Sequence, residues 1–133
     1  MRYLLDVNAL VALAVIQHEF HGRMAAWIRR MSSKGEGRLA TCAITELGFI
    51  RVLAQVPQYG ASVSLARDLL RRLKNEAGLD VTFLADTLDA SRLPGWVRSA
   101  KQITDGHLVQ LARAGGAVLA TLDKRIPAAY RIP

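Results

Sequence analysis

Residues 3–17 read YLLDVNALVALAVIQ, and the order of residue types in this stretch indicates the fold class. The three apolar residues at 3–5 predict a short strand that ends at Asp6. Residues 9–17 are almost entirely apolar, which predicts a helix buried on all sides. A strand followed by a charged residue and a buried helix is typical of a crossover connection in a parallel sheet.

The same alternation continues to the end of the chain. Strands are predicted at residues 39–42, 81–84 and 117–121, and helices at 20–31, 43–56, 63–77 and 104–114. Pro57 and Gly78 end two of these helices, while Thr104 and Gly115 are the predicted N-cap and C-cap of the last one. We therefore predict an α/β fold for a single domain, 1–133. It has three layers: a central, mostly parallel sheet of four or five strands, with helices on both faces.

Composition narrows the possible function. The chain has 133 residues, of which 51% are hydrophobic, so it is neither disordered nor too short for a core. Its single cysteine, Cys42, excludes an internal disulfide and a cysteine zinc site. The formal charge of +7 favours a polyanionic partner, nucleic acid or an acidic protein. No apolar run approaches the ~20 residues that span a bilayer, so we expect no membrane segment and a cytoplasmic location.

Four carboxylates occupy informative positions in this pattern. Asp6 follows the first strand and Asp123 the last, Glu46 lies near the start of the helix after the second strand, and Asp105 begins the last helix. Sites in parallel sheets lie beyond the carboxyl ends of the strands, where the strand order reverses. We therefore expect all four side chains to point toward one end of the sheet.

Such a cluster needs a cation, because like charges in one cleft repel one another. The four motifs contain no cationic side chain except Lys124 and Arg125 beside Asp123. Ligand sets made only of oxygen favour Mg²⁺ or Mn²⁺, which activate water for attack on a phosphodiester. Asp6, Glu46, Asp105 and Asp123 are thus the predicted catalytic and metal-binding residues.

Two polar residues beside these motifs are predicted to support the site. Asn8 has two interpretations: it caps the following helix, or its amide holds Asp6 or a metal-bound water. Thr121 is predicted to orient a ligand through its hydroxyl.

The four acidic motifs together resemble those of the PIN domain, in the form found in VapC-type ribonuclease toxins. They are LLDVNAL at 4–10, TELGF at 45–49, ITDGHL at 103–108 and TLD at 121–123. The resemblance covers nearly the whole chain. It implies a central first strand, dependence on Mg²⁺ or Mn²⁺, cleavage of RNA, inhibition by a cognate antitoxin, and a homodimer. Residues 57–101 depart most from the pattern, so the RNA target stays open.

The resemblance also predicts how the antitoxin binds. An arginine of the inhibitor is expected among the carboxylates, where its planar guanidinium pairs with two oxygens at once. The rest of the contact is expected in an apolar groove between the early helices, with Trp27 and the helix at 63–77 as walls. Arg67, Arg71 and Lys74 form one stripe of that helix, which is either a solvated face or a surface for RNA or antitoxin.

Three other classes of protein are alternatives. A haloacid-dehalogenase-like phosphatase also has an aspartate after its first strand, but it needs a second acid where this chain has Asn8. A receiver-like signalling domain needs an aspartate after a mid-chain strand, and the strand at 39–42 lacks one. A non-enzymatic, basic RNA-binding module with a degenerate site would have lost acids, whereas all four are present.

Several other residues stay open at this stage. His18 and His21 have a spacing that suits zinc, but they lack two further ligands and are predicted to be structural or solvated. Asp86 has two interpretations: it is solvated, or it touches the site. Trp96 has three interpretations: stacking on a base, packing in an interface, or packing in the core.

Overall fold

The computed structural model describes all 133 residues and has a five-stranded, fully parallel sheet at its centre. The strands are β1 (Arg2–Leu5), β2 (Arg38–Cys42), β3 (Asp80–Leu84), β4 (Ala117–Thr121) and β5 (Tyr130–Arg131), in the order β3-β2-β1-β4-β5. The first strand is central, as expected. β5 was not among the four located strands, because two residues are too few to show a periodic pattern.

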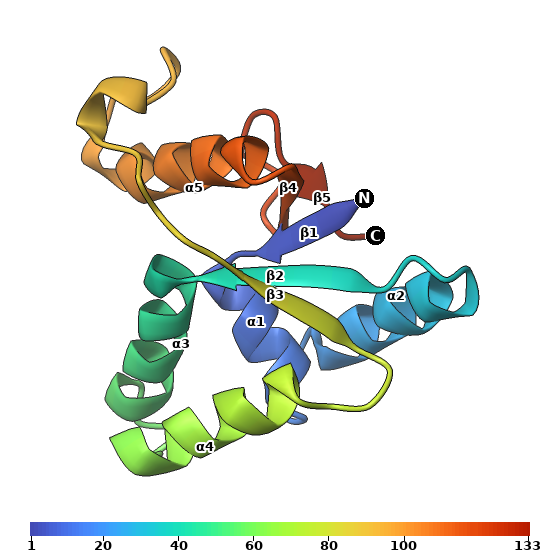
Figure 1. Cartoon of the computed structure of the whole chain (residues 1–133). Coiled ribbons are helices and arrows are strands. Elements are labelled where there is room, and N and C mark those ends of the chain that lie inside the picture. Colours follow the sequence, from blue (N-terminus) through green and yellow to red (C-terminus); the bar gives the residue numbers. More distant parts are fainter.

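Helices cover both faces of the sheet, which confirms the three layers (Figure 1). α1 (Val7–Ala14), α2 (His21–Ser33), α3 (Ala43–Gln55) and α4 (Val63–Lys74) lie on one side, and α5 (Ile103–Ala114) lies on the other. Two single 3₁₀ turns, Ala90–Arg92 and Ala100–Gln102, precede α5. No helix combines the length and the apolar character needed to cross a membrane.

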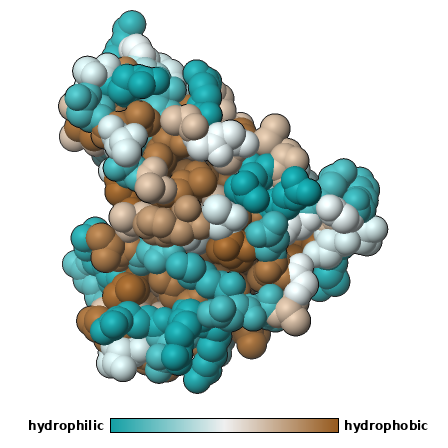
Figure 2. Space-filling view, in the orientation of Figure 1, coloured by the Kyte–Doolittle hydropathy of each residue, from teal (hydrophilic) through white to brown (hydrophobic).

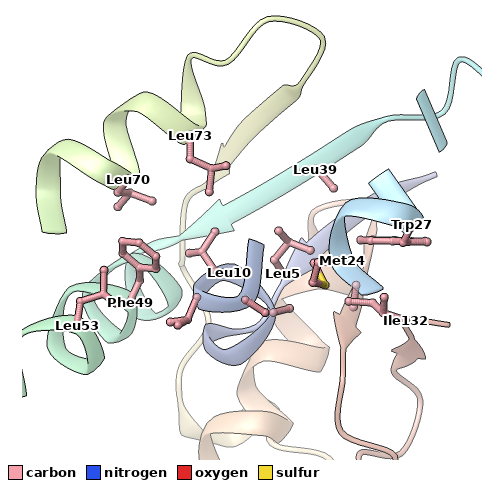
Figure 3. Packing of buried hydrophobic residues seen from close by; sticks show 14 of the residues in the cluster. Leu5, Leu10, Met24, Trp27, Leu39, Phe49, Leu53, Leu70, Leu73 and Ile132 are labelled. Carbon is pink, nitrogen blue, oxygen red and sulfur yellow. The ribbon is translucent and has the colours of Figure 1, made fainter. Parts of the chain in front are cut away.

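Neighbouring residues of the strands supply two separate cores. Leu5 of β1 packs into a cluster of 16 buried residues with α1 to α4, in which Leu10, Phe49 and Leu70 come from different helices (Figure 3). Leu4, one residue earlier, packs into a cluster of nine with α5. Because successive side chains of a strand point to opposite faces, one short apolar strand stabilises both layers.

The sheet reverses its strand order between β1 and β4. The connections from β1 to β3 pass over one face, and α5, which leads into β4, covers the other face. At this switch point the Asp6 N–H donates to the Ala120 carbonyl, 3.1 Å away. The carboxyl ends of β1 and β2 point toward the edge where α3 and α5 begin, on the left in Figure 1. Binding sites of such sheets form at this edge.

Several predicted helix boundaries are wrong by one to three residues, and those of α1, α4 and α5 have a clear cause. α1 begins at Val7 and ends at Ala14, because Asp6 caps it and Val15 has extended backbone angles. α4 ends at Lys74 with Asn75 as its C-cap, three residues before the predicted end. α5 begins at Ile103, because the preceding 3₁₀ turn runs directly into it. Thr104 is therefore not the N-cap, whereas Gly115 is the C-cap, as predicted.

Candidate active site

Asp6 is the most deeply buried carboxylate at the switch point. Its side chain begins α1, where Oδ1 accepts a hydrogen bond from the Ala9 N–H at 2.8 Å. The Thr121 hydroxyl donates to Oδ2 at 2.5 Å. Only 7% of the residue is exposed, and this burial raises the pKa of Asp6, with help from the negative charges of Asp105 and Asp123. The two hydrogen bonds oppose the rise in pKa because they favour the charged form.

Thr121 connects two of the predicted ligands. Its hydroxyl donates to Asp6 and also accepts from the Asp123 N–H at 2.9 Å, so one buried side chain sets the spacing of both motifs. The supporting contact predicted for Thr121 is therefore present. The interpretation of Asn8 as a helix cap is wrong, because Asp6 occupies the capping position. Asn8 is exposed and is the second residue of α1, and the structure shows no hydrogen bond from its side chain to Asp6.

Asp105 and Asp123 lie near each other and near Asp6. Asp105 is in the first turn of α5, and partial burial, followed by the charge of Asp123, raises its pKa. Asp123 has a cationic partner: both of its oxygens accept from the Arg125 guanidinium, at 3.0 and 3.1 Å. These hydrogen bonds hold the pKa of Asp123 below its ordinary value. Three aspartates from distant parts of the chain are thus close enough for their charges to interact.

Glu46 has its own partners. One oxygen, Oε2, accepts from the Thr41 hydroxyl at 2.6 Å and from the Lys74 ammonium at 2.7 Å. The Lys74 side chain is 30% exposed and that of Glu46 19%, so the pair is shielded from solvent only in part. Lys74 lies outside the four acidic motifs, so the motifs themselves gave no sign of this partner. Lys74 comes from α4, 28 residues away, and its place in the stripe with Arg67 and Arg71 was the only signal in the sequence.

The donor chemistry suits a hard divalent cation. The side-chain donors at the switch point are carboxylate oxygens, and the raised pKa values of Asp6 and Asp105 show that burial and neighbouring negative charge disfavour ionisation there. As the side chains stand, however, no three carboxylate, histidine or cysteine groups are placed to share one ion. Two of the four carboxylates are oriented toward protein cations instead, Glu46 toward Lys74 and Asp123 toward Arg125.

A second pair of side chains ties the end of β3 to α5. Asp86 Oδ2 and His107 Nε2 are 2.5 Å apart, and this hydrogen bond lowers the pKa of Asp86. Asp86 is exposed, as predicted, but its side chain is not free in solvent: it is 24% exposed and hydrogen-bonded to His107. The sequence signal was weak, because neither residue repeats in a pattern.

The remaining open residues have structural roles. His21 contacts the Ala12 carbonyl at 2.9 Å, and His18 accepts from the Phe20 N–H at 3.0 Å, in agreement with the structural interpretation. Trp96 is partly buried and packs against the α5 core, in agreement with its third interpretation, while stacking on a base and packing in an interface stay predictions.

Comparison with known proteins places this arrangement in a family. The profile of the PIN domain family matches residues 3–132. The chain belongs to the PIN domain family. Its relatives include ribonuclease VapC44 of Mycobacterium tuberculosis, 40% identical over 134 residues that cover 95% of this chain and 89% of that protein. Ribonuclease VapC38 of the same organism is 38% identical over 127 residues, which cover 90% of this chain and 84% of that protein.

The crystal structure of M. tuberculosis VapC20, a toxin that cleaves the sarcin–ricin loop, has the same PIN fold. Its TM-score is 0.61 at 13% identity, with 95% of this chain and 93% of that chain covered. Family membership rules out the phosphatase and receiver interpretations. In this PIN domain the first and last acidic motifs flank the switch point, and Thr121 of the last motif is hydrogen-bonded to Asp6 of the first. The second motif contacts α4 through the ion pair of Glu46 with Lys74.

Proposed function

We propose that this PIN domain is a toxin that hydrolyses RNA phosphodiester bonds, with Asp6, Glu46, Asp105 and Asp123 as the catalytic and metal-binding residues. The observation that carries the proposal is that Thr121 joins Asp6 to Asp123 at the switch point, with Asp105 near enough to raise the pKa of Asp6, in a chain whose relatives are named ribonucleases. The chain has a net charge of +7, which suits an RNA substrate.

The four carboxylates are proposed to hold Mg²⁺ or Mn²⁺. When bound, such an ion supplies a water of lowered pKa and stabilises charge on the phosphate oxygens. The chain itself positions the carboxylates. The Thr121 hydroxyl and the Ala9 N–H each donate to one oxygen of Asp6, and α5 places Asp105 near Asp6. Glu46 would complete the set only if its side chain turned away from Lys74, to which it is now bound.

Cleavage of RNA with and without a divalent cation tests the proposal. We expect Asp6→Asn to lower the rate by about 10²-fold or more, the usual effect of removing one electrostatic stabiliser. Asp89→Asn is the matched control, because Asp89 is an exposed aspartate whose capping role an asparagine can fill. Products should carry 5′-phosphate and 3′-hydroxyl ends, since water is the nucleophile. Full activity in EDTA, or cyclic phosphate ends, would contradict the mechanism.

We also propose a cognate antitoxin as partner, seated on an apolar surface made by α1, α2 and α4. Two grooves of about 880 and 870 Å³ share Ala14, Ile16 and Leu69, and most of the residues that line them are hydrophobic. Ile16 is 76% exposed between the two grooves. α4 is thus a wall of this surface, as predicted, but Trp27 is not: it is 2% exposed and packs edge-on against Tyr3 in the core.

Substitution at Ile16 tests the antitoxin surface. Ile16→Glu places a charge between the two grooves and should weaken binding of the antitoxin encoded beside the toxin gene, measured by calorimetry. Leu47→Glu is the control, since Leu47 is 60% exposed on α3 and lines neither groove. Equal affinities of the two variants would argue against this surface. A twofold homodimer stays a prediction, to be checked by sedimentation.

A further inference from the structure

A third groove lies on the opposite side of α4, between α4 and α3. It has a volume of about 300 Å³, and Arg67, Arg71 and Lys74 line it together with Glu46. The three cations lie at i, i+4 and i+7, so they follow one side of the helix. Figure 2 shows hydrophilic side chains gathered over the α3 and α4 part of the face in view. This groove differs in character from the two apolar grooves on the α1 and α2 side.

Stabilisation of the α4 dipole does not explain all of the positive charge in the groove. Basic residues near the C-terminal end of a helix stabilise its dipole, which accounts for Arg71, Arg72 and Lys74 in the last turn. Arg67 is in the middle of the helix, and the structure shows no ion pair for it. Arg71 pairs only with Asp68 on its own helix, at 3.1 Å and with 71% of its side chain exposed. Both guanidinium groups can therefore take an external anion.

The position of the groove indicates which anion it takes. Lys74 is a wall of the groove and also donates to Glu46, so the groove opens directly onto the second acidic motif. A strand of RNA cut at this site continues past it on both sides, and its neighbouring phosphates must pass the negative charge of the carboxylates. Cationic side chains beside the site offset that repulsion and set the path of the strand.

We propose that the groove between α3 and α4 binds a backbone phosphate of the RNA strand next to the cleaved bond, through Arg67, Arg71 and Lys74. This inference rests on the proposed ribonuclease function and deepens it. Because phosphate contacts carry no base information, the groove positions the strand and does not select its sequence.

A comparison of two neighbouring arginines tests the inference. Arg71 and Arg72 are both exposed and lie in the same turn of α4, but only Arg71 lines this groove, whereas Arg72 faces the groove on the α2 side. Each Arg→Ala change lowers the net charge by one, so the general attraction for RNA falls equally in both variants. Any difference between them reports a local contact.

The measurement is binding of a fluorescent, short single-stranded RNA by anisotropy over a range of NaCl concentrations, with Asp6→Asn in every protein to prevent cleavage. Arg71→Ala and Arg67→Ala should each weaken binding about fivefold and reduce the slope of log K against log salt by about 0.7, the value for one lost single-strand phosphate contact. Arg72→Ala should change affinity by less than about twofold, the effect of net charge alone. In the cleaving protein, Arg71→Ala should raise KM and leave kcat nearly unchanged.

The outcomes separate this inference from the proposed function. If RNA binds with the expected pattern but no metal supports cleavage, the proposed function fails and the phosphate groove stands. If cleavage is confirmed but the three arginine variants bind RNA alike, the groove is not a phosphate site. Failure of the parent protein to bind RNA even at low salt would also overturn the inference. So would a loss of antitoxin affinity in Arg71→Ala with RNA binding intact.

Discussion

Thr121→Val removes the hydroxyl that joins the first and fourth acidic motifs while keeping the shape of the side chain. Thr121 is 1% exposed, so the added methyl group occupies the space that the hydroxyl leaves. Two hydrogen bonds are lost, one to the Asp6 carboxylate and one from the Asp123 N–H. We expect the fold to survive but the free energy of unfolding to fall.

The size of the loss follows from the two partners. A hydrogen bond to a buried charged group contributes about 1.5–3 kcal/mol, and one from a backbone N–H contributes about 0.5–1.5 kcal/mol. Burial of the new methyl group returns about 0.8 kcal/mol. The net destabilisation at neutral pH is therefore about 2 kcal/mol. The loss should shrink in acid, because the hydroxyl stabilises the charged form of Asp6 and protonation removes that charge.

A double-mutant cycle with Asp6→Asn isolates the contact, with urea unfolding as the assay. An asparagine keeps the capping position but has no charge, so the same Thr121→Val change should cost only about 1 kcal/mol in that background. The coupling energy between the two positions is then about 1 kcal/mol. Equal costs in both backgrounds, or a cost below about 0.5 kcal/mol in wild type, would show that the hydroxyl does not stabilise the Asp6 carboxylate.

Three further changes probe the surroundings of the site. Burial raises the pKa of Asp6 in the folded protein, so its charge destabilises the metal-free protein as pH rises from the unfolded pKa through the folded pKa. The stability gained by Asp6→Asn should therefore grow over that pH window and then level off. A stability difference that does not change with pH would contradict the assignment. Glu46→Gln should instead destabilise the protein by about 1 kcal/mol in thermal unfolding, because Lys74 loses its anionic partner. Gly48→Ala would place a Cβ 2.5 Å from a methyl group of Val7 and should cost about 1–3 kcal/mol; Val7→Ala in the same chain should recover most of that loss if the clash is the cause.

The sequence predicted well those elements that are determined by the pattern of neighbouring residues. The alternation of short apolar strands with helices predicted the parallel sheet and the end of the sheet where Asp6 and Asp123 lie, while the central position of β1 came from the resemblance to the PIN domain. Helix ends were less predictable, because Asp6 itself is the cap of α1 and no pattern in residues 15–17 shows where the apolar run leaves the helix. β5 was missed for a related reason: a two-residue strand gains its identity only from its neighbour β4.

The partners of the site residues were less predictable than their positions. Lys74 reaches Glu46 across 28 residues, and Asp86 reaches His107 across 21. Such contacts depend on how α4 and the segment after β3 pack against α3 and α5, and single-sequence periodicity carries no information about that packing. Arg125 differs, because it is two residues from Asp123 and its proximity was visible in the sequence.

These partners show that the four acidic motifs are not equivalent. In the sequence they are four carboxylates of the same kind, each at a strand end or a helix start. In the structure Glu46 and Asp123 each have a cation supplied by the chain, whereas burial raises the pKa values of Asp6 and Asp105, with a further rise from Asp123 at both and from Asp105 at Asp6. The negative charge without a protein cation is therefore concentrated at Asp6 and Asp105, between β1 and the start of α5. If the proposed divalent ion binds, it would relieve the largest electrostatic cost there, and Glu46 and Asp123 would have to leave Lys74 and Arg125 in order to take part.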